Sequence, residues 1–182
     1  LFPYTTLFRS PVAGSGVVSS PDDRREGAGK ARNDVKIAIG ADHGGFDLKT
    51  GLIRSLERRG LEVRDVGCFD RQSVDYPDYA HEVAQQVSAG QVDQGILVCT
   101  TGIGMSIAAN KVPGAYAALC YNKEVAVLSR QHNNANILVL GAKFVSSTEL
   151  TEIVEAWLKT DFEGGPHLRR FKQIQDIEKK IK

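Results

Sequence analysis

The sequence predicts an α/β protein: a three-layer α/β/α sandwich with a five-stranded, parallel, Rossmann-like sheet and a C-terminal helix. Three observations predict this fold class. Short apolar runs alternate along the chain with stretches of helical periodicity. Most of the helical stretches have roughly the 10–15 residues that are typical of helices in βαβ units. The central apolar run is nearly continuous, as expected for a parallel strand that helices cover on both faces.

The fold begins with the β-branched run "VKIAIGA" at residues 35–41, which we expect to form the first strand. The stretch "FDLKTGLIRSLERRG" at residues 46–60 follows as the first helix. Apolar residues such as Leu52 and Leu56 recur there at helical spacing, and Gly60 is a typical stop signal.

The next three elements repeat the alternation. "EVRDVG" at residues 62–67 predicts the second strand, and "DYPDYAHEVAQQVSAGQ" at residues 75–91 predicts a helix with Val83 and Val87 on one face. "GILVCT" at residues 95–100 is the most continuous apolar run and predicts the central strand of the sheet.

The second half of the chain completes the sheet. Ser146 followed by Glu149 resembles a capping box, which marks the start of a helix. The expected helices cover residues 104–111, 122–133, 146–160 and about 167–181, and the expected strands cover residues 115–121 and 136–142. The last helix is too long and too charged to be fully buried.

The composition indicates one ordinary domain, which we assign to residues 35–182. Of the 182 residues, 42% are hydrophobic and 25% are charged, which is enough for a sizeable core. The formal net charge is +1 without long runs of like charge, so we expect no nucleic-acid partner. We also expect no membrane partner, because no apolar stretch approaches the roughly 18 residues of a membrane span.

The cysteines and the first 34 residues indicate the compartment and the domain boundary. Cys68, Cys99 and Cys120 are odd in number and widely spaced, so they predict neither a disulfide framework nor a structural zinc site. A reducing cytoplasm is the simplest location. Residues 1–34 are rich in Gly, Pro, Ser and charge and make a poor signal peptide. We interpret them as a disordered or artefactual leader.

Polar stretches at strand ends indicate where a ligand would bind. In open α/β sheets ligands bind beyond the carboxyl ends of the strands. "ADHGG", "TTGIG" and "GAKF" follow the first, third and fifth strands and should share that edge. "RQHNN" leads into the fifth strand instead, so it should lie at the opposite edge, unless its helix is long or a partner subunit supplies it.

Cys99 is the most informative residue of this edge. It could be a packed small residue, part of a nucleotide-binding loop, or a nucleophile or base. "TGIGMS" is a weak dinucleotide signal, because Ile107 stands where G-x-G-x-x-G needs glycine. Cys99 ends a strand and precedes a turn and a helix start, an environment that stabilises a thiolate and whose N–H groups can hold an anion.

Other polar residues would complete acid–base chemistry. Asp42 could simply cap the following helix, or it could face the same crevice as Cys99 together with His43. His132 and its neighbour Asn133 lie in a polar loop, where a solvated surface histidine is the simpler interpretation. A thiol, a carboxylate and two histidines without metal-ligand spacing indicate proton transfer that needs neither metal nor cofactor.

Five motifs in order give the chain a family resemblance. They are "IGADHGGFDLK", "DYPDYA", "CTTGIGMSIAANK", "LSRQHNNANILVLGA" and "FEGGPHLRR", over roughly residues 35–175. Together they resemble the ribose-5-phosphate isomerase B family, which includes galactose- and allose-6-phosphate isomerases. The resemblance covers the whole predicted domain.

The resemblance implies an aldose–ketose isomerase that works through a cis-enediolate. Cys99 would be the base, Thr101 would assist near the reacting oxygens, and the loop N–H groups would hold the enediolate. His132 would open the sugar ring with help from Asp42. The substrate-binding residues that the resemblance implies are Asp42, His43, Tyr76, Thr100, Gly102, Ile103, Gly104, Asn133, Lys143 and Arg170. The family builds its site between two subunits, which would bring "RQHNN" to a neighbour's crevice.

The chain departs from the family pattern at three positions. Thr100 replaces the usual glycine after the cysteine, and a β-branched residue narrows the loop's conformations. Pro166 stands where a phosphate-binding arginine is common, and Lys143 where an arginine is frequent. Lysine attracts phosphate without bidentate geometry. Arg170 matches the second arginine, and Arg169 is a candidate substitute.

The sequence therefore predicts a cytoplasmic, metal-independent isomerase of ribose 5-phosphate and ribulose 5-phosphate, in the pentose phosphate pathway of carbohydrate metabolism. We expect a homodimer or tetramer with sites between subunits. The nearest alternative is the same chemistry on a hexose or tetrose phosphate. A non-catalytic module that binds a phosphate ligand is the alternative from another class, and Cys99 argues against it, because such a module needs no thiol beside an oxyanion loop.

Overall fold

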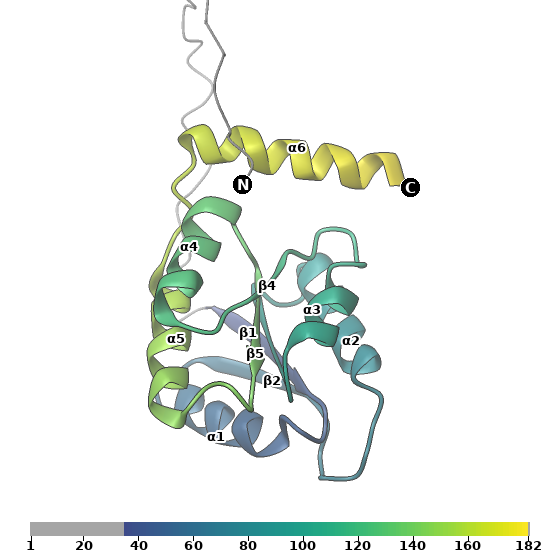
Figure 1. Ribbon diagram of the computed structural model, residues 1–182, viewed down its shortest axis with the longest axis vertical. Coiled ribbons are helices and arrows are strands. Elements are labelled where there is room, and N and C mark those ends of the chain that lie inside the picture. Colours follow the sequence, from purple (N-terminus) through teal and green to yellow (C-terminus); the bar gives the residue numbers. More distant parts are fainter. Residues whose placement is uncertain (1–34, 182) are drawn as a thin grey trace, which may run out of the picture.

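The structure, a computed structural model, describes residues 35–181 and contains one parallel sheet with the strand order β2-β1-β3-β5-β4 (Figure 1). The expectation of a leader in residues 1–34 lies outside the described residues. The strands are β1 (Lys36–Ala41), β2 (Glu62–Gly67), β3 (Gln94–Cys99), β4 (Ala117–Leu119) and β5 (Ile137–Gly141). The helices are α1 (Phe46–Glu57), α2 (Tyr76–Ser88), α3 (Ile103–Ala109), α4 (Lys123–Asn133), α5 (Ser147–Lys159) and α6 (Gly165–Ile181).

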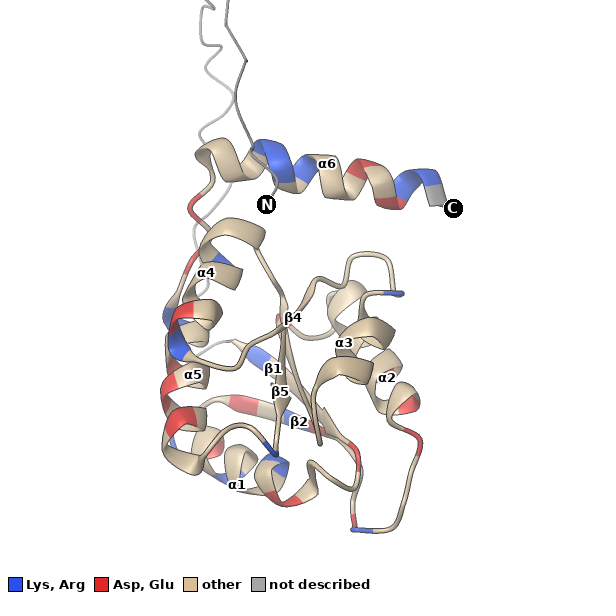
Figure 2. Ribbon diagram, viewed as in Figure 1, with Lys and Arg blue, Asp and Glu red and all other residues tan. Residues whose placement is uncertain are grey.

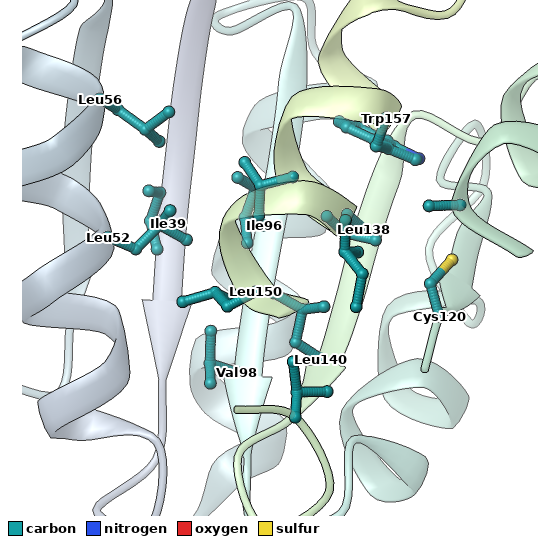
Figure 3. Packing of buried hydrophobic residues seen from close by; sticks show 14 of the residues in the cluster. Ile39, Leu52, Leu56, Ile96, Val98, Cys120, Leu138, Leu140, Leu150 and Trp157 are labelled. Atoms are coloured by element: carbon teal, nitrogen blue, oxygen red, sulfur yellow. The ribbon is translucent and has the colours of Figure 1, made fainter. Parts of the chain in front are cut away.

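Helices cover both faces of the sheet, which confirms the predicted sandwich. Alternate residues of each strand point to opposite faces. Ile39 of β1 packs with α1 and α5 in one hydrophobic cluster, and Ala38 packs with α2 and α3 in the other. Figure 3 shows the first cluster, on one face of the sheet. Leu52 and Leu56 of α1 pack against one half of this face, and Trp157 of α5 packs against the other half.

The helix starts follow the sequence signals. Ser146 accepts the backbone N–H of Glu149, and the Glu149 carboxylate accepts the backbone N–H of Ser146, so the predicted capping box is present. Hydrogen bonds from the Ser146 hydroxyl and backbone N–H lower the pKa of Glu149. Asn122 caps α4 in a similar way by accepting the N–H of Val125 at 2.8 Å.

Strand β4 is shorter than the predicted run of residues 115–121. It pairs with β5 on one side, and side chains bond to the backbone at its start. The Asn110 amide bonds to both the N–H and the C=O of Ala117, and Asn136 accepts the N–H of Tyr116 at 2.7 Å. β4 is an edge strand, so its outer backbone groups need such partners.

Helix α6 lies across the amino-terminal edge of the sheet (Figure 1). Phe171 is buried there with its ring 4.8 Å from that of Tyr116, just before β4. Glu178 accepts the N–H of Gly114 from the same region. The helix starts two residues before the predicted residue 167, and positive and negative residues alternate in blocks along it (Figure 2). Among the described helices, none combines the length and the apolar character that crossing a membrane requires.

Candidate active site

Cys99 is the last residue of β3, and its side chain is 5% exposed. The backbone N–H of Gly102 donates to its Sγ atom at 3.0 Å. Gly102 has a φ of 80°, and a Cβ there would collide with Leu119, so only glycine fits this turn. The thiol is packed against the core and, at the same time, held by the loop that follows it.

The loop after Cys99 is tied to the end of β5. The N–H of Ala142 donates to the Cys99 carbonyl at 2.8 Å, and the N–H of Lys143 donates to the Thr100 carbonyl at 3.1 Å. The Thr101 hydroxyl accepts the N–H of Ile103 at 3.3 Å, at the start of α3. These bonds fix the loop backbone and place Lys143 at the same edge as the thiol.

The loop after β1 lies against the same turn. Asp42 is buried, its N–H donates to the Val98 carbonyl at 3.2 Å, and its Oδ1 atom accepts the N–H of Gly45 at 2.9 Å. The structure does not make Asp42 the cap of α1, because Gly45 is the N-cap; Asp42 instead holds the turn that leads into this helix. Gly44 leaves room for the Thr100 side chain, whose hydroxyl a Cβ at Gly44 would overlap.

Two further predicted residues lie at this edge, where the β1–α1 loop and the start of α2 contact their neighbours. His43 Nδ1 accepts the N–H of Val74 at 3.3 Å. The Tyr76 ring, at the start of α2, covers Gly104 so closely that a Cβ there would lie 2.5 Å from the ring. The structure thus gathers Asp42, His43, Tyr76, Cys99, Thr100, Thr101, Gly102, Ile103, Gly104 and Lys143 around the carboxyl ends of the strands.

The remaining predicted residues lie elsewhere. His132 and Asn133 end α4, which runs back toward the start of β5, and Arg170 lies on α6 at the same amino-terminal edge. Figure 1 shows the end of α4 next to α6 and away from the strand ends that carry the thiol loop. Within one chain, His132 and Cys99 therefore lie at opposite edges of the sheet. The order of the elements predicted this separation.

The comparisons with known proteins identify the family of this fold. A family model described as Ribose/Galactose Isomerase matches residues 37–174. The chain belongs to this family. Ribose-5-phosphate isomerase B of Escherichia coli is 47% identical over 145 residues, which are 80% of this chain and 97% of that protein.

Solved structures show the same isomerase fold. Ribose-5-phosphate isomerase B of Clostridium thermocellum matches with a TM-score of 0.80 and 50% identity, over 81% of this chain and 99% of that one. The enzyme of Mycoplasma genitalium, solved with bound ribulose-5-phosphate, matches with a TM-score of 0.76 and 43% identity, over 79% and 96% of the two chains.

The other two cysteines of this ribose/galactose isomerase differ from Cys99. Burial raises the pKa of Cys68, and it raises the pKa of Cys120 to about 11. Cys120 lies in the core, where its thiol contacts the Ser129 hydroxyl at 3.8 Å. Neither thiol accepts a hydrogen bond from the N–H of a following loop, as Cys99 does.

The sequence reasoning missed two residues at the amino-terminal edge. The His167 ring stacks on the His132 ring with centroids 4.0 Å apart, and the Glu163 carboxylate lies beside both. Both residues belong to the motif "FEGGPHLRR", so this motif was the available signal. Among the described residues, these three side chains form one group that could hold a metal ion.

Proposed function

We propose that this chain interconverts ribose 5-phosphate and ribulose 5-phosphate, with Cys99 as the base. The observation that carries the proposal is the thiol held by the Gly102 N–H at the carboxyl end of β3, the strand to which the Asp42 N–H also bonds, at Val98. A relative with the ribose-5-phosphate isomerase B name that is 47% identical, and solved structures with the same name, support this substrate.

The reaction is a proton transfer between two adjacent carbons. The Cys99 thiolate removes the proton from C2 of the open-chain aldose, and the C–H electron pair forms the C1–C2 double bond of an enediolate. The oxygen on C1 then carries the negative charge, which the N–H groups of the loop stabilise. The thiol then returns its proton to C1, the hydroxyl proton on the C2 oxygen passes to the C1 oxygen, and the C2 oxygen becomes the ketose carbonyl. We assign the Thr101 hydroxyl to the proton transfer between these two oxygens.

We further propose that the site is completed by a second copy of the chain. His132 opens the sugar ring with Asp42, while Asn133 and Arg170 bind substrate. His132, Asn133 and Arg170 come from the other subunit. Exposed apolar side chains around both edges support self-association. At the carboxyl edge these are Ile103, Ile107, Tyr121 and Phe144, and on α6 they are Leu168, Ile174 and Ile177.

The substrate alternatives differ in chain length. A hexose or tetrose phosphate would undergo the same proton transfer, and the altered phosphate contacts at Pro166 and Lys143 leave room for such a substrate. The ribulose-5-phosphate bound in the Mycoplasma genitalium structure favours the pentose.

The three cysteines are free, which fits our expectation of a reducing cytoplasm.

The test is isomerase activity against aldose phosphates of four, five and six carbons, in the presence of EDTA. We expect the highest kcat/KM for ribose 5-phosphate and no effect of the chelator. Iodoacetamide should inactivate the enzyme through Cys99, and bound substrate should protect it. A preference for a hexose phosphate would move the assignment to that substrate, and inactivity on every sugar phosphate would refute an isomerase.

A further inference from the structure

Three potential metal ligands from separate segments meet at the amino-terminal edge of the sheet. They are His132 at the end of α4, Glu163 in the α5–α6 connection and His167 in the first turn of α6. The Glu163 Oε2 atom lies 3.9 Å from His132 Nε2 and 3.8 Å from His167 Nε2. One donor atom from each residue lies within 4.8 Å of the other two.

The backbone holds this group in place. The N–H of Glu163 donates to the Gln131 carbonyl at 3.1 Å, which ties the connection to the last turn of α4. Gly164 and Gly165 have φ angles of 67° and 52°, so the chain turns sharply between the carboxylate and the second imidazole. Substituting either glycine would strain the turn that aims His167 back at His132.

The donor set matches a divalent transition metal. Two imidazoles and one carboxylate form a three-ligand set that zinc uses, with a fourth position left for water. Zinc–nitrogen and zinc–oxygen bonds of about 2.0–2.2 Å place tetrahedral ligands about 3.4 Å apart. The observed separations of 3.8 and 3.9 Å therefore need to close by only about half an ångström.

The rings must also change their angle. They are parallel to within 3°, so one imidazole has to turn before both Nε2 lone pairs meet at one ion. The side chains of His132 and Glu163 are 39% and 49% exposed, which leaves them room for this movement. The His167 side chain is 21% exposed and better fixed, so the first imidazole is the one that turns.

We propose that His132, Glu163 and His167 form a binding site for a divalent transition metal such as Zn²⁺, and that an ion bound there inhibits the isomerase. Metal binding takes the Nε2 lone pair of His132, which then cannot take part in proton transfer during ring opening. The binding half of this proposal stands on the geometry alone. The inhibition half rests on the proposed function.

Binding is tested by calorimetric titration of the full chain with Zn²⁺ alone. The chain carries Cys99→Ala, so that the thiol at the carboxyl edge does not compete for the ion. We expect one zinc per chain. Glu163→Gln and His167→Asn in the same background should each weaken binding at least about tenfold, since loss of even a supporting group around a bound metal costs about 10–100-fold. His81→Ala, an exposed histidine on α2, is the matched control and should bind as its parent does.

Equal affinity in all four chains, or no zinc binding, would overturn the site. Inhibition is tested with Cys99 restored: the zinc concentration that halves the activity should rise at least about tenfold in His167→Asn and stay unchanged in His81→Ala. Zinc binding at these residues without inhibition would overturn the inhibitory role. A chain that isomerises no sugar phosphate refutes the proposed function instead, and the calorimetric result stands independently of it.

Discussion

The two edges of the sheet hold their polar residues in different ways. At the carboxyl edge, Cys99 and Asp42 are 5% and 6% exposed, and backbone N–H groups bond to both side chains. At the amino-terminal edge, the His132 side chain is 39% exposed and its polar neighbours are other side chains. The Cys99 thiol is thus held by the backbone of its own chain, whereas the His132 imidazole lies among other side chains on a partly exposed surface.

The topology explains this difference. Parallel strands bring their carboxyl ends to one edge, so loops after β1, β3 and β5 converge there without help from another chain. Each connecting helix runs back to the opposite edge, where the next strand begins. The end of α4, which precedes β5, therefore lies at the amino-terminal edge. A catalytic site that uses both edges therefore needs two chains, each contributing the edge that the other lacks.

The largest effect should come from removing the base at the carboxyl edge. Cys99→Ala deletes the group that moves the proton while the backbone of the loop remains. We expect turnover to fall by about two orders of magnitude or more, the usual contribution of a positioned acid or base. Steady-state rates and circular dichroism of the purified variant measure activity and folding separately.

The matched control is Cys120→Ala, at a buried thiol outside the loop. It should keep near-normal turnover and lose about 1 kcal/mol of stability, the central value for point substitutions. Turnover near that of the unmodified enzyme in a folded Cys99→Ala chain would remove the thiol from the mechanism and leave the carboxyl edge as a binding surface only.

A mixing experiment tests whether the two edges work in trans. Cys99→Ala and His132→Ala should each be nearly inactive alone. After subunit exchange into random dimers, half of the dimers are hybrids, and each hybrid has one intact site and one doubly damaged site. We expect recovery of up to about a quarter of the unmodified activity.

Subunit exchange must be shown independently, for example by mass spectrometry of differently tagged chains. The control is a mixture of two Cys99→Ala preparations that differ only in their tags. It measures any recovery of activity that handling alone causes. Proven exchange without recovered activity would place both residues in the site of one subunit, in conflict with their separation in this fold.

The carboxyl edge could be predicted from the sequence because its signals are local. An apolar run, a polar residue after it and glycines in the next turn lie within a few residues of one another at Cys99. The order of the strands in the sheet was not predicted from the sequence, and the family resemblance added the roles expected of the residues. The separation of His132 from Cys99 also followed from the order of elements alone.

The amino-terminal edge could not be predicted to the same extent. Glu163 and His167 meet His132 only because α6 folds back over the end of α4, and no local pattern encodes that packing. The length of β4 was overestimated for a similar reason. The side chains of Asn110 and Asn136 bond to its backbone, and such partners are chosen by tertiary structure rather than by strand propensity.

The next largest effect concerns phosphate binding at the amino-terminal edge. Pro166 has no side-chain donor, so Arg170 should carry most of the charge that holds the phosphate. Removing one charge-assisted hydrogen bond, worth about 1.5–3 kcal/mol, should raise KM roughly tenfold or more in Arg170→Ala. Arg169→Ala is the neighbouring control, because successive helical residues point about 100° apart, and it should have a small effect.

Pro166→Arg tests the same phosphate contact by adding an arginine where the family pattern has one. It should lower KM for the pentose phosphate if the only difference from the family pattern is a missing contact. A folded Pro166→Arg chain with weaker binding would show that this edge is shaped for a different sugar phosphate. Equal effects of Arg169→Ala and Arg170→Ala would contradict the assignment of the phosphate contact to one face of α6.

The smallest effect is expected at Thr100, within the preorganised edge. Its side chain lies against Gly44, close to the Asp42 carboxylate, and so adds bulk to the edge where we propose that the substrate binds. Thr100→Gly removes that bulk, and we expect kcat/KM for a six-carbon aldose phosphate to rise relative to the five-carbon one. A change of about 1 kcal/mol, at the low end for one methylene in a pocket, corresponds to roughly fivefold. Thr100→Ser keeps the hydroxyl and removes only the methyl group, so it should fall between the two. If the ratio of the two substrates is the same in all three chains, Thr100 does not limit the size of the substrate, and the carboxyl edge distinguishes sugars by its hydrogen bonds alone.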